Sequence, residues 1–199
     1  MSGSATSLEP SIVFALLAAG GATRFGGRKL AANLADKPVW SWAANAAAAA
    51  GFIDRICIVR DDWAPAREMQ ALGWLVVVNP EADTGMASSI KLACTAAGVC
   101  RRLVISLADM PFVTSDHLRI LALADGVAFT RYPSGKIGVP AAFPQDVFRK
   151  LATLHGDRGA ASLDWGPDLT TVTPALPDTL IDVDTPDDLA RASALLARR

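Results

Sequence analysis

Cysteine and histidine are scarce in this 199-residue chain, which has three cysteines and two histidines. The cysteines, Cys57, Cys94 and Cys100, are odd in number and show no C-x-x-C spacing. A structural zinc site usually needs four such ligands at short spacings, so the sequence argues against one. The same scarcity argues against a disulfide framework, and we expect a reducing, cytoplasmic location.

An excess of positive charge is also missing. Lys and Arg number 19 and Asp and Glu number 20, which leaves a net charge of −1 at pH 7. This balance excludes a general attraction to nucleic acid or to an anionic membrane, so any anion site must be local.

Long apolar runs are absent as well, since none approaches the roughly 20 residues of a membrane span. Residues 1–10 are rich in serine and lack the basic start and apolar core of a signal peptide. The length suits one domain. We therefore expect a flexible segment over residues 1–10 and a single domain over residues 11–199.

Short apolar segments alternate with segments of helical spacing along most of the chain. The expected strands cover residues 12–18, 55–60, 74–78, 103–107, 127–130, 139–143 and 170–173. The expected helices cover residues 38–50, 65–72, 86–97, 114–124, 144–154, 158–163 and 186–197. Such alternation predicts an α/β fold with a mostly parallel sheet and helices on both faces. Ligands bind beyond the carboxyl ends of such strands, so the loops that start at Gly20, Asn79 and Asp109 are expected on one rim.

The segment after the first expected strand is rich in glycine and in positive charge. Glycine lets the backbone approach a phosphate closely, and Arg and Lys neutralise its charge. The segment fits neither G-x-G-x-x-G, because Ala22 and Phe25 stand where glycines are needed, nor a P-loop, because Gly27 follows Gly26. A glycine-rich turn with solvated cations is the alternative interpretation.

Carboxylates follow two later segments. Asp109 comes directly after a buried strand, where it suits either a helix cap or a Mg²⁺ ligand. Asp182 and Asp184 alternate on an extended segment and so point to the same side, which calls for a cation or solvent. Thr185 with Asp188 three residues later predicts a helix N-terminus by itself.

Five segments, in order, resemble the molybdenum cofactor nucleotidyltransferase family, the MobA-like NTP transferases. They are Leu17-Ala-Ala-Gly-Gly-Ala-Thr-Arg-Phe-Gly-Gly-Arg-Lys29, Asn79-Pro-Glu-Ala-Asp-Thr-Gly-Met-Ala-Ser-Ser89, Leu107-Ala-Asp-Met-Pro111, Gly156-Asp-Arg-Gly-Ala160 and Asp182-Val-Asp-Thr-Pro-Asp-Asp188. The resemblance implies a Rossmann-like, three-layer nucleotidyltransferase fold of the GT-A-like type. Gly138-Val-Pro140 parallels a further family element but has Val139 where the family has His.

The resemblance also implies roles for individual residues. Arg24, Lys29 and Asp109 are the expected catalytic residues. Asp109 and Asp184 are the expected Mg²⁺ ligands, and Asp182 is the alternative to Asp184. The expected nucleotide-binding residues are Leu17, Ala18, Ala19, Gly20, Gly21, Arg24, Lys29, Gly85, Ser88 and Ser89. The expected acceptor-binding residues are Gly138, Pro140, His155, Asp157 and Arg158. Ordinary helix capping by Ser88 and Ser89, and a plain surface loop at His155 and Arg158, are the alternatives.

The activity that this family implies is transfer of a nucleotide from a nucleoside triphosphate to molybdopterin, with release of pyrophosphate. Leu17-Ala-Ala-Gly20 and Gly85-Met-Ala-Ser-Ser89 are closest to the molybdopterin cytidylyltransferases, which favours CTP. The alternatives are GTP with the same acceptor, and a non-catalytic nucleotide- or cofactor-binding accessory protein for a molybdoenzyme. A recipient molybdoenzyme is a further partner that the resemblance suggests.

Overall fold

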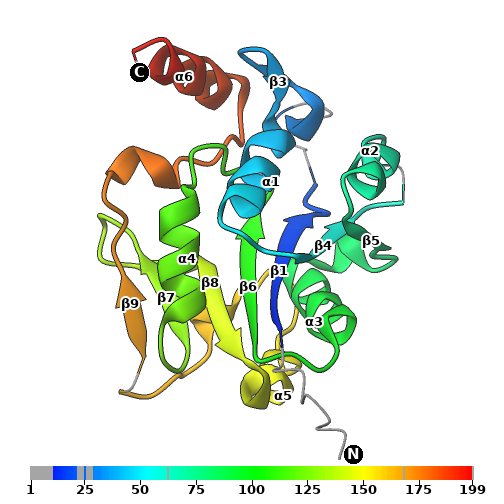
Figure 1. The fold of residues 1–199 in the computed structure, drawn as a ribbon, viewed down its shortest axis with the longest axis vertical. Helices are drawn as coiled ribbons and strands as arrows, with labels where there is room; N and C mark the ends of the chain where they lie inside the picture. The colour runs from blue at the N-terminus through cyan, green and yellow to red at the C-terminus, as the bar shows by residue number, and fades with distance from the viewer. Residues whose placement is uncertain (1–10, 22–24, 26–28, 62, 168, 199) are drawn as a thin grey trace, which may run out of the picture.

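A seven-stranded sheet forms the centre of the fold, with strand order β5-β4-β1-β6-β8-β7-β9 (Figure 1). The computed structural model describes residues 11–198 except 22–24, 26–28, 62 and 168. The strands are β1 (Ile12–Ala18), β4 (Asp54–Val59), β5 (Leu75–Val78), β6 (Arg102–Leu107), β7 (Ala128–Arg131), β8 (Ile137–Pro144) and β9 (Thr170–Val172). Strand β8 runs antiparallel to β6 and β7, and the other neighbours pair in parallel. The mostly parallel sheet that the sequence predicts is confirmed.

Helices cover both faces of this sheet. They are α1 (Val39–Ala49), α2 (Ala66–Ala71), α3 (Met86–Ala97), α4 (Ser115–Leu123), α5 (Phe148–Leu151) and α6 (Pro186–Leu196). Side chains alternate across a strand, so Phe14 and Leu16 of β1 pack in one buried cluster with α1 and α4. Ala15 and Leu17 pack in a second cluster with α3 and α5. The sheet therefore lies between two helical layers, as expected.

The sequence-based prediction is wrong in the segments around residues 145–163. The helix expected over residues 144–154 is a 3-10 turn over Gln145–Val147 followed by the single turn of α5. The helix expected over residues 158–163 is only a 3-10 turn over Ala160–Ser162. Its first residue follows Gly159, whose backbone is extended, and glycine is a weak helix former.

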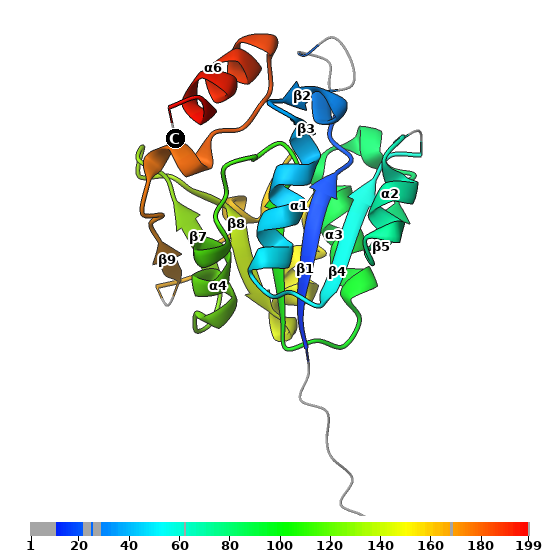
Figure 2. The same ribbon diagram turned by 45° about the horizontal axis from the view of Figure 1, so that its top comes forward.

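A small two-stranded ribbon, which the sequence pattern did not predict, lies at the carboxyl end of β1. It consists of β2 (Asn33–Leu34) and β3 (Lys37–Pro38), and β2 contacts α6 (Figure 2). These elements border the rim where the loops after β1, β5 and β6 emerge. In the part of the chain that the structure describes, no helix is long and apolar enough to cross a membrane.

Candidate active site

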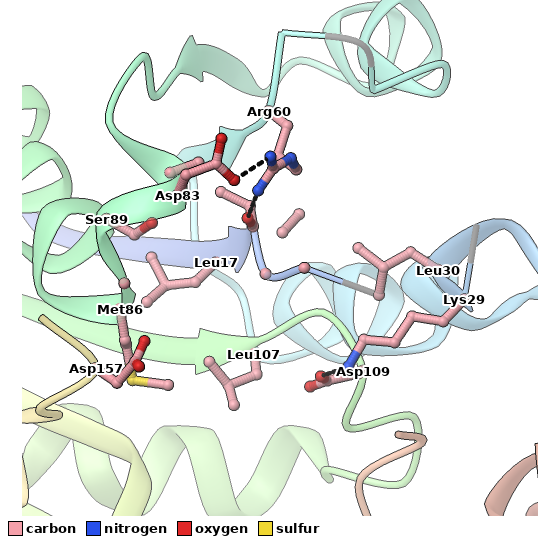
Figure 3. A pocket seen from close by; sticks show the side chains of 16 residues that line it. Leu17, Lys29, Leu30, Arg60, Asp83, Met86, Ser89, Leu107, Asp109 and Asp157 are labelled. Carbon is pink, nitrogen blue, oxygen red and sulfur yellow. Dashed lines mark hydrogen bonds and ion pairs between the residues drawn. The ribbon is translucent and has the colours of Figure 1, made fainter. Parts of the chain in front are cut away.

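A cavity of about 290 Å³ opens at the carboxyl ends of the parallel strands. Its lining includes residues of the loops that follow β1, β5 and β6, the three loops expected at this rim, as well as Arg60 after β4 and Asp157 (Figure 3). The expectation that these loops share one rim is therefore confirmed. A parallel sheet forces this arrangement because the carboxyl ends of its strands lie on the same edge.

The end of β1 forms one wall of the cavity. Leu17, Ala18 and Ala19 line it and are buried, and the exposed Gly20 and Gly21 continue the wall. Among the described residues, no atom lies within 4 Å of the position that a Cβ would take on either glycine. A ligand can therefore approach this stretch of backbone closely. The expected catalytic residue Arg24 lies outside the described residues.

Lys29 joins two of the predicted carboxylates at the edge of this cavity. Its ammonium Nζ donates to Asp109 Oδ2 at 2.6 Å and to Asp184 Oδ1 at 2.7 Å. Lys29 is 6% exposed, so both ion pairs are shielded from water on the lysine side. Burial alone lowers the pKa of Lys29, but the charges and hydrogen bonds of Asp109 and Asp184 outweigh it and raise that pKa above 10.5. Lys29 is therefore a permanent cation.

The segment that carries Asp182 and Asp184 is anchored by the residue between them. Val183 is fully buried, and its backbone N–H donates to the carbonyl of Asp109 at 2.9 Å. Because side chains alternate on an extended segment, burying Val183 turns both aspartates toward the rim. Asp184 reaches Lys29, whereas Asp182 is exposed.

Asp182 lies in a negatively charged neighbourhood. Loss of solvation is the main cause that raises its pKa, and the charges of Asp184 and Asp109 add to it. Burial, together with the charges of Asp182 and Asp109, also raises the pKa of Tyr132 to about 12. The phenol is therefore neutral, and its hydroxyl donates to the Val139 carbonyl at 2.6 Å.

Asp109 and Asp184 fit a divalent cation that is shared with a phosphate ligand. Within the described ranges, no group of three or more His, Cys, Asp or Glu side chains is placed to hold a metal ion. Mg²⁺ is commonly held by only one or two carboxylates, with substrate phosphates completing its shell. Asp109 Oδ1 is buried and has no hydrogen-bond partner among the described residues. A cation bound at this oxygen would satisfy its unused capacity as an acceptor.

The loop before α3 forms the opposite wall, and Gly85 makes its geometry possible. Gly85 has φ +109°, and a Cβ on it would lie 2.4 Å from the carbonyl carbon of Gly156. The N–H of Ala87 donates to the Gly156 carbonyl at 3.0 Å. The absence of a side chain at Gly85 therefore lets two distant loops meet, which brings Asp157 into the cavity lining.

The two serines of this loop differ in position. Ser89 lines the cavity, whereas the Ser88 hydroxyl lies within 2.9 Å of the Glu81 carbonyl and 2.8 Å of the Gly85 carbonyl. The buried Asn79 side chain donates to both hydroxyls at 2.9 Å. Ser88 thus shapes the loop, but it does not cap α3, whose N-terminus has no side-chain cap among the described residues.

The expected acceptor residues are not gathered in one place. Asp157 lines the cavity, whereas His155 is exposed and Arg158 donates to the Ser162 carbonyl at 3.3 Å. Gly138 packs under the ring of Tyr132, where a Cβ would lie 3.1 Å from a ring carbon.

Pro140 belongs to a buried network instead. Its carbonyl accepts from Thr130 Oγ1 at 2.6 Å, and His117 Nε2 lies 2.7 Å from the same hydroxyl. Since the hydroxyl proton goes to Pro140, Nε2 is the donor to Thr130 and Nδ1 is the unprotonated nitrogen. Nδ1 is buried with no partner in the described chain, so burial lowers the pKa of His117 to about 4.

Sequence reasoning missed one pair of charged residues in the cavity wall. Arg60, directly after β4, donates to Asp83 Oδ1 at 2.5 Å and to the Ala19 carbonyl at 3.4 Å (Figure 3). The pair ties together the loops after β1, β4 and β5. The position of Arg60 at the carboxyl end of an expected parallel strand could have indicated a role in the site, because these strand ends share the ligand-binding edge of the sheet.

Comparison with known families and solved structures finds nucleotidyltransferase domains similar to this chain. The family model described as MobA-like NTP transferase domain matches residues 14–165. Comparison with curated proteins gives no significant match. A solved nucleotidyl transferase of Methanothermobacter (Mth528) is 24% identical, with a TM-score of 0.82, covering 94% of this chain and 98% of its own.

Two other solved proteins have the same fold. Rv0371c of Mycobacterium tuberculosis is 28% identical, with a TM-score of 0.72 and coverage of 92% of this chain and 98% of its own. Its complex with manganese superposes with a TM-score of 0.68 at 24% identity and covers 94% of this chain and 99% of its own. Molybdopterin-guanine dinucleotide biosynthesis protein A of Archaeoglobus fulgidus is 19% identical, with a TM-score of 0.71 and coverage of 94% and 100%. The three-layer nucleotidyltransferase fold is therefore confirmed.

Proposed function

The chain belongs to the MobA-like NTP transferase family and is a nucleotidyltransferase, and we propose that it transfers CMP from CTP to the terminal phosphate of molybdopterin. In this reaction an oxygen of the acceptor phosphate forms a bond to the α-phosphorus of CTP. The bond between that phosphorus and the bridging oxygen of the β-phosphate breaks, and pyrophosphate leaves.

One observation carries the proposal: Lys29, Asp109 and Asp184 converge at the edge of a cavity walled by the glycine loop. Their contacts of 2.6 and 2.7 Å join residues 80 and 155 positions apart in the sequence. Helix capping by Asp109 does not account for this arrangement. A buried cation between two carboxylates, next to accessible backbone, suits a reaction between anionic phosphates.

The triphosphate is proposed to lie along the end of β1. The N–H groups of Gly20 and Gly21 and the ammonium of Lys29 would hold its oxygens, together with Arg24. Such groups offset the charge that grows on the departing pyrophosphate. The base would lie toward Gly85 and Ser89, on the wall that also holds Asp83.

Asp109 and Asp184 are the proposed ligands of a divalent metal ion, and Mg²⁺ is the proposed ion. When bound, such an ion neutralises phosphate charge and polarises the phosphorus under attack. The manganese complex of Rv0371c supports a divalent metal at this type of fold. Asp182, which is exposed and does not reach Lys29, is the less suitable partner.

The residues of this chain act on the transfer by position and charge. A phosphate nucleophile is already anionic, so the reaction needs no side chain as general base. Asp157 lines the cavity on the wall opposite β1, where it can orient the groups that enter between the loops. Of the other expected acceptor residues, the exposed His155 and Arg158 remain proposed contacts. Gly138 and the buried Pro140 would act only indirectly, through the positions of Tyr132 and Thr130.

Release of pyrophosphate from CTP, GTP, ATP and UTP, each with Mg²⁺ and molybdopterin, tests this function. We expect CTP to be the best substrate and the product to be a cytosine dinucleotide of the cofactor, identified by mass spectrometry. Better turnover of GTP would replace the nucleotide assignment. Absence of pyrophosphate release with every triphosphate would favour the non-catalytic accessory protein.

A further inference from the structure

The ammonium of Lys29 occupies the space between the two carboxylates that are suited to a divalent metal. It contacts one oxygen of each, at 2.6 Å on Asp109 and 2.7 Å on Asp184. Two anions that face one cation in a shielded site are held together by it, because unpaired they would repel each other. In this state the lysine performs the charge compensation that a metal ion would provide.

Lys29 is also placed to serve the triphosphate, because it lines the same cavity as Gly20 and Gly21. The ammonium has three N–H donors, and two of them already point at the carboxylates, so a polyphosphate that takes more than one donor must draw the ammonium away from Asp109 and Asp184. The side chain has four rotatable carbon bonds and can change partners without moving the backbone. A nucleotide that takes these donors therefore leaves the two carboxylates open to another cation.

We propose that Lys29 is a resident counter-cation that keeps divalent metal ions off Asp109 and Asp184 until a nucleotide draws the ammonium to its phosphates. This inference rests on the proposed function for the identity of the nucleotide. Its consequence is an ordered assembly, in which metal ions bind weakly to the free protein and tightly to its nucleotide complex.

Charge arithmetic supports the exchange. With Lys29 in place, the three groups carry a net charge of −1, and without it the carboxylate pair carries −2. A divalent cation that approaches the free protein must displace the ammonium or share the carboxylates with it. Removing the positive charge of Lys29 therefore strengthens metal binding. If Lys29 instead helped to hold the metal ion, its removal would weaken metal binding.

Titration of the nucleotide-free protein with Mn²⁺, followed by the electron paramagnetic resonance signal of the unbound ion, tests the exchange. We expect Lys29→Met to bind Mn²⁺ at least tenfold more tightly than the wild type. Lys29→Gln, which keeps a hydrogen-bond donor and no charge, should show the same direction and serves if the Met variant fails to fold. Lys91→Met removes the same charge from α3, outside the cavity lining, and should leave Mn²⁺ affinity unchanged.

The double variant Lys29→Met/Asp109→Asn locates the effect. We expect it to lose the tightened binding, because one of the two carboxylates is gone. Equal Mn²⁺ affinity of wild type and Lys29 variants, or tight binding that persists in the double variant, would overturn the inference.

The experiment is separable from the test of function, since no nucleotide is present in the titration. Pyrophosphate release by the wild type together with unchanged Mn²⁺ binding in the Lys29 variants refutes the exchange alone. Tightened binding in a protein that releases no pyrophosphate refutes the proposed function and leaves the exchange in place.

Discussion

Gly85 is the position where a single methyl group should damage the site most directly. A Cβ there would lie 2.4 and 2.5 Å from the carbonyl carbon and oxygen of Gly156, which are backbone atoms. It would also lie 2.6 Å from Asp157 Oδ1, a side-chain atom that can turn away. Gly85→Ala therefore forces the two loops apart.

Two costs add in this variant. An alanine at φ +109° is strained by about 1–3 kcal/mol. Separating the loops also breaks the 3.0 Å hydrogen bond from Ala87 N–H to the Gly156 carbonyl, which contributes about 1 kcal/mol. We expect the free energy of unfolding to fall by about 2–4 kcal/mol, which for a chain of this size lowers Tm by about 5–15 °C.

Gly98→Ala is the matched control, at the other end of α3. Gly98 has φ +58°, so alanine is strained there too, but no atom of the described chain lies within 4 Å of its Cβ position. Differential scanning calorimetry of both variants separates strain from contact, and steady-state kinetics measures the effect on the cavity. We expect KM for CTP to rise at least tenfold in Gly85→Ala and to stay near the wild-type value in Gly98→Ala. Equal losses of stability and equal KM values in the two variants would refute the close-contact explanation.

Three further predictions follow from single contacts. Asp109→Asn should lower kcat for pyrophosphate release at least a thousandfold while the protein still folds. Arg119→Ala should lower the free energy of unfolding in urea by about 1–2 kcal/mol, because Arg119 donates to the last carbonyls of α1, Ala49 at 2.6 Å and Ala50 at 3.3 Å. Burial lowers the pKa of His117 to about 4 in the folded protein. Between pH 6.5 and 4 this histidine is therefore protonated in the unfolded chain and neutral in the folded one. Its contribution to stability is therefore complete above pH 6.5 and is lost as the pH falls. Between pH 7 and 5 the loss is about 2 kcal/mol, and urea unfolding of His117→Gln should show a smaller drop.

Control variants carry the same type of substitution at positions away from these contacts. Asp54→Asn, at the opposite end of β4, and Arg67→Ala, on the exposed side of α2, should have little effect. Near-normal turnover of Asp109→Asn would remove Asp109 from the metal site. If Arg119→Ala is as stable as Arg67→Ala, the hydrogen bonds of Arg119 to α1 do not stabilise the fold. If the free energy of unfolding depends on pH in the same way in His117→Gln and the wild type, His117 does not cause that dependence.

Local features of the structure could be predicted from the sequence because their causes are local. The apolar run from Ile12 to Ala18 is a buried strand with side chains on both faces. Thr114 caps α4 by accepting from His117 N–H. Thr185 and Asp188 form the capping box that their spacing predicts. Each depends on residues a few positions apart, which the chain brings together in any fold.

The glycine-rich segments near residue 156 show where local reasoning failed. The sequence predicted a helix over residues 158–163, but Gly156 has φ +59° and belongs to a loop that contacts Gly85. That contact joins positions about 70 residues apart in the chain, and no local propensity encodes it. The same limit hid the Arg60–Asp83 ion pair, which closes only when β4 and β5 lie side by side.

The family, the alternating strands and helices and the charged residues of the site could be predicted from the sequence, since all of these follow from residue types at short spacings. That Asp184 contacts Lys29 depends on tertiary structure, because the burial of Val183 turns both aspartates toward the rim and the packing of the segment places Asp184 within reach of the ammonium. It also placed the ammonium of Lys29 between two carboxylates that lie far apart in the chain. Side chains respond to the charges around them in space, so this pairing could be seen only after the sheet had brought its strand ends together.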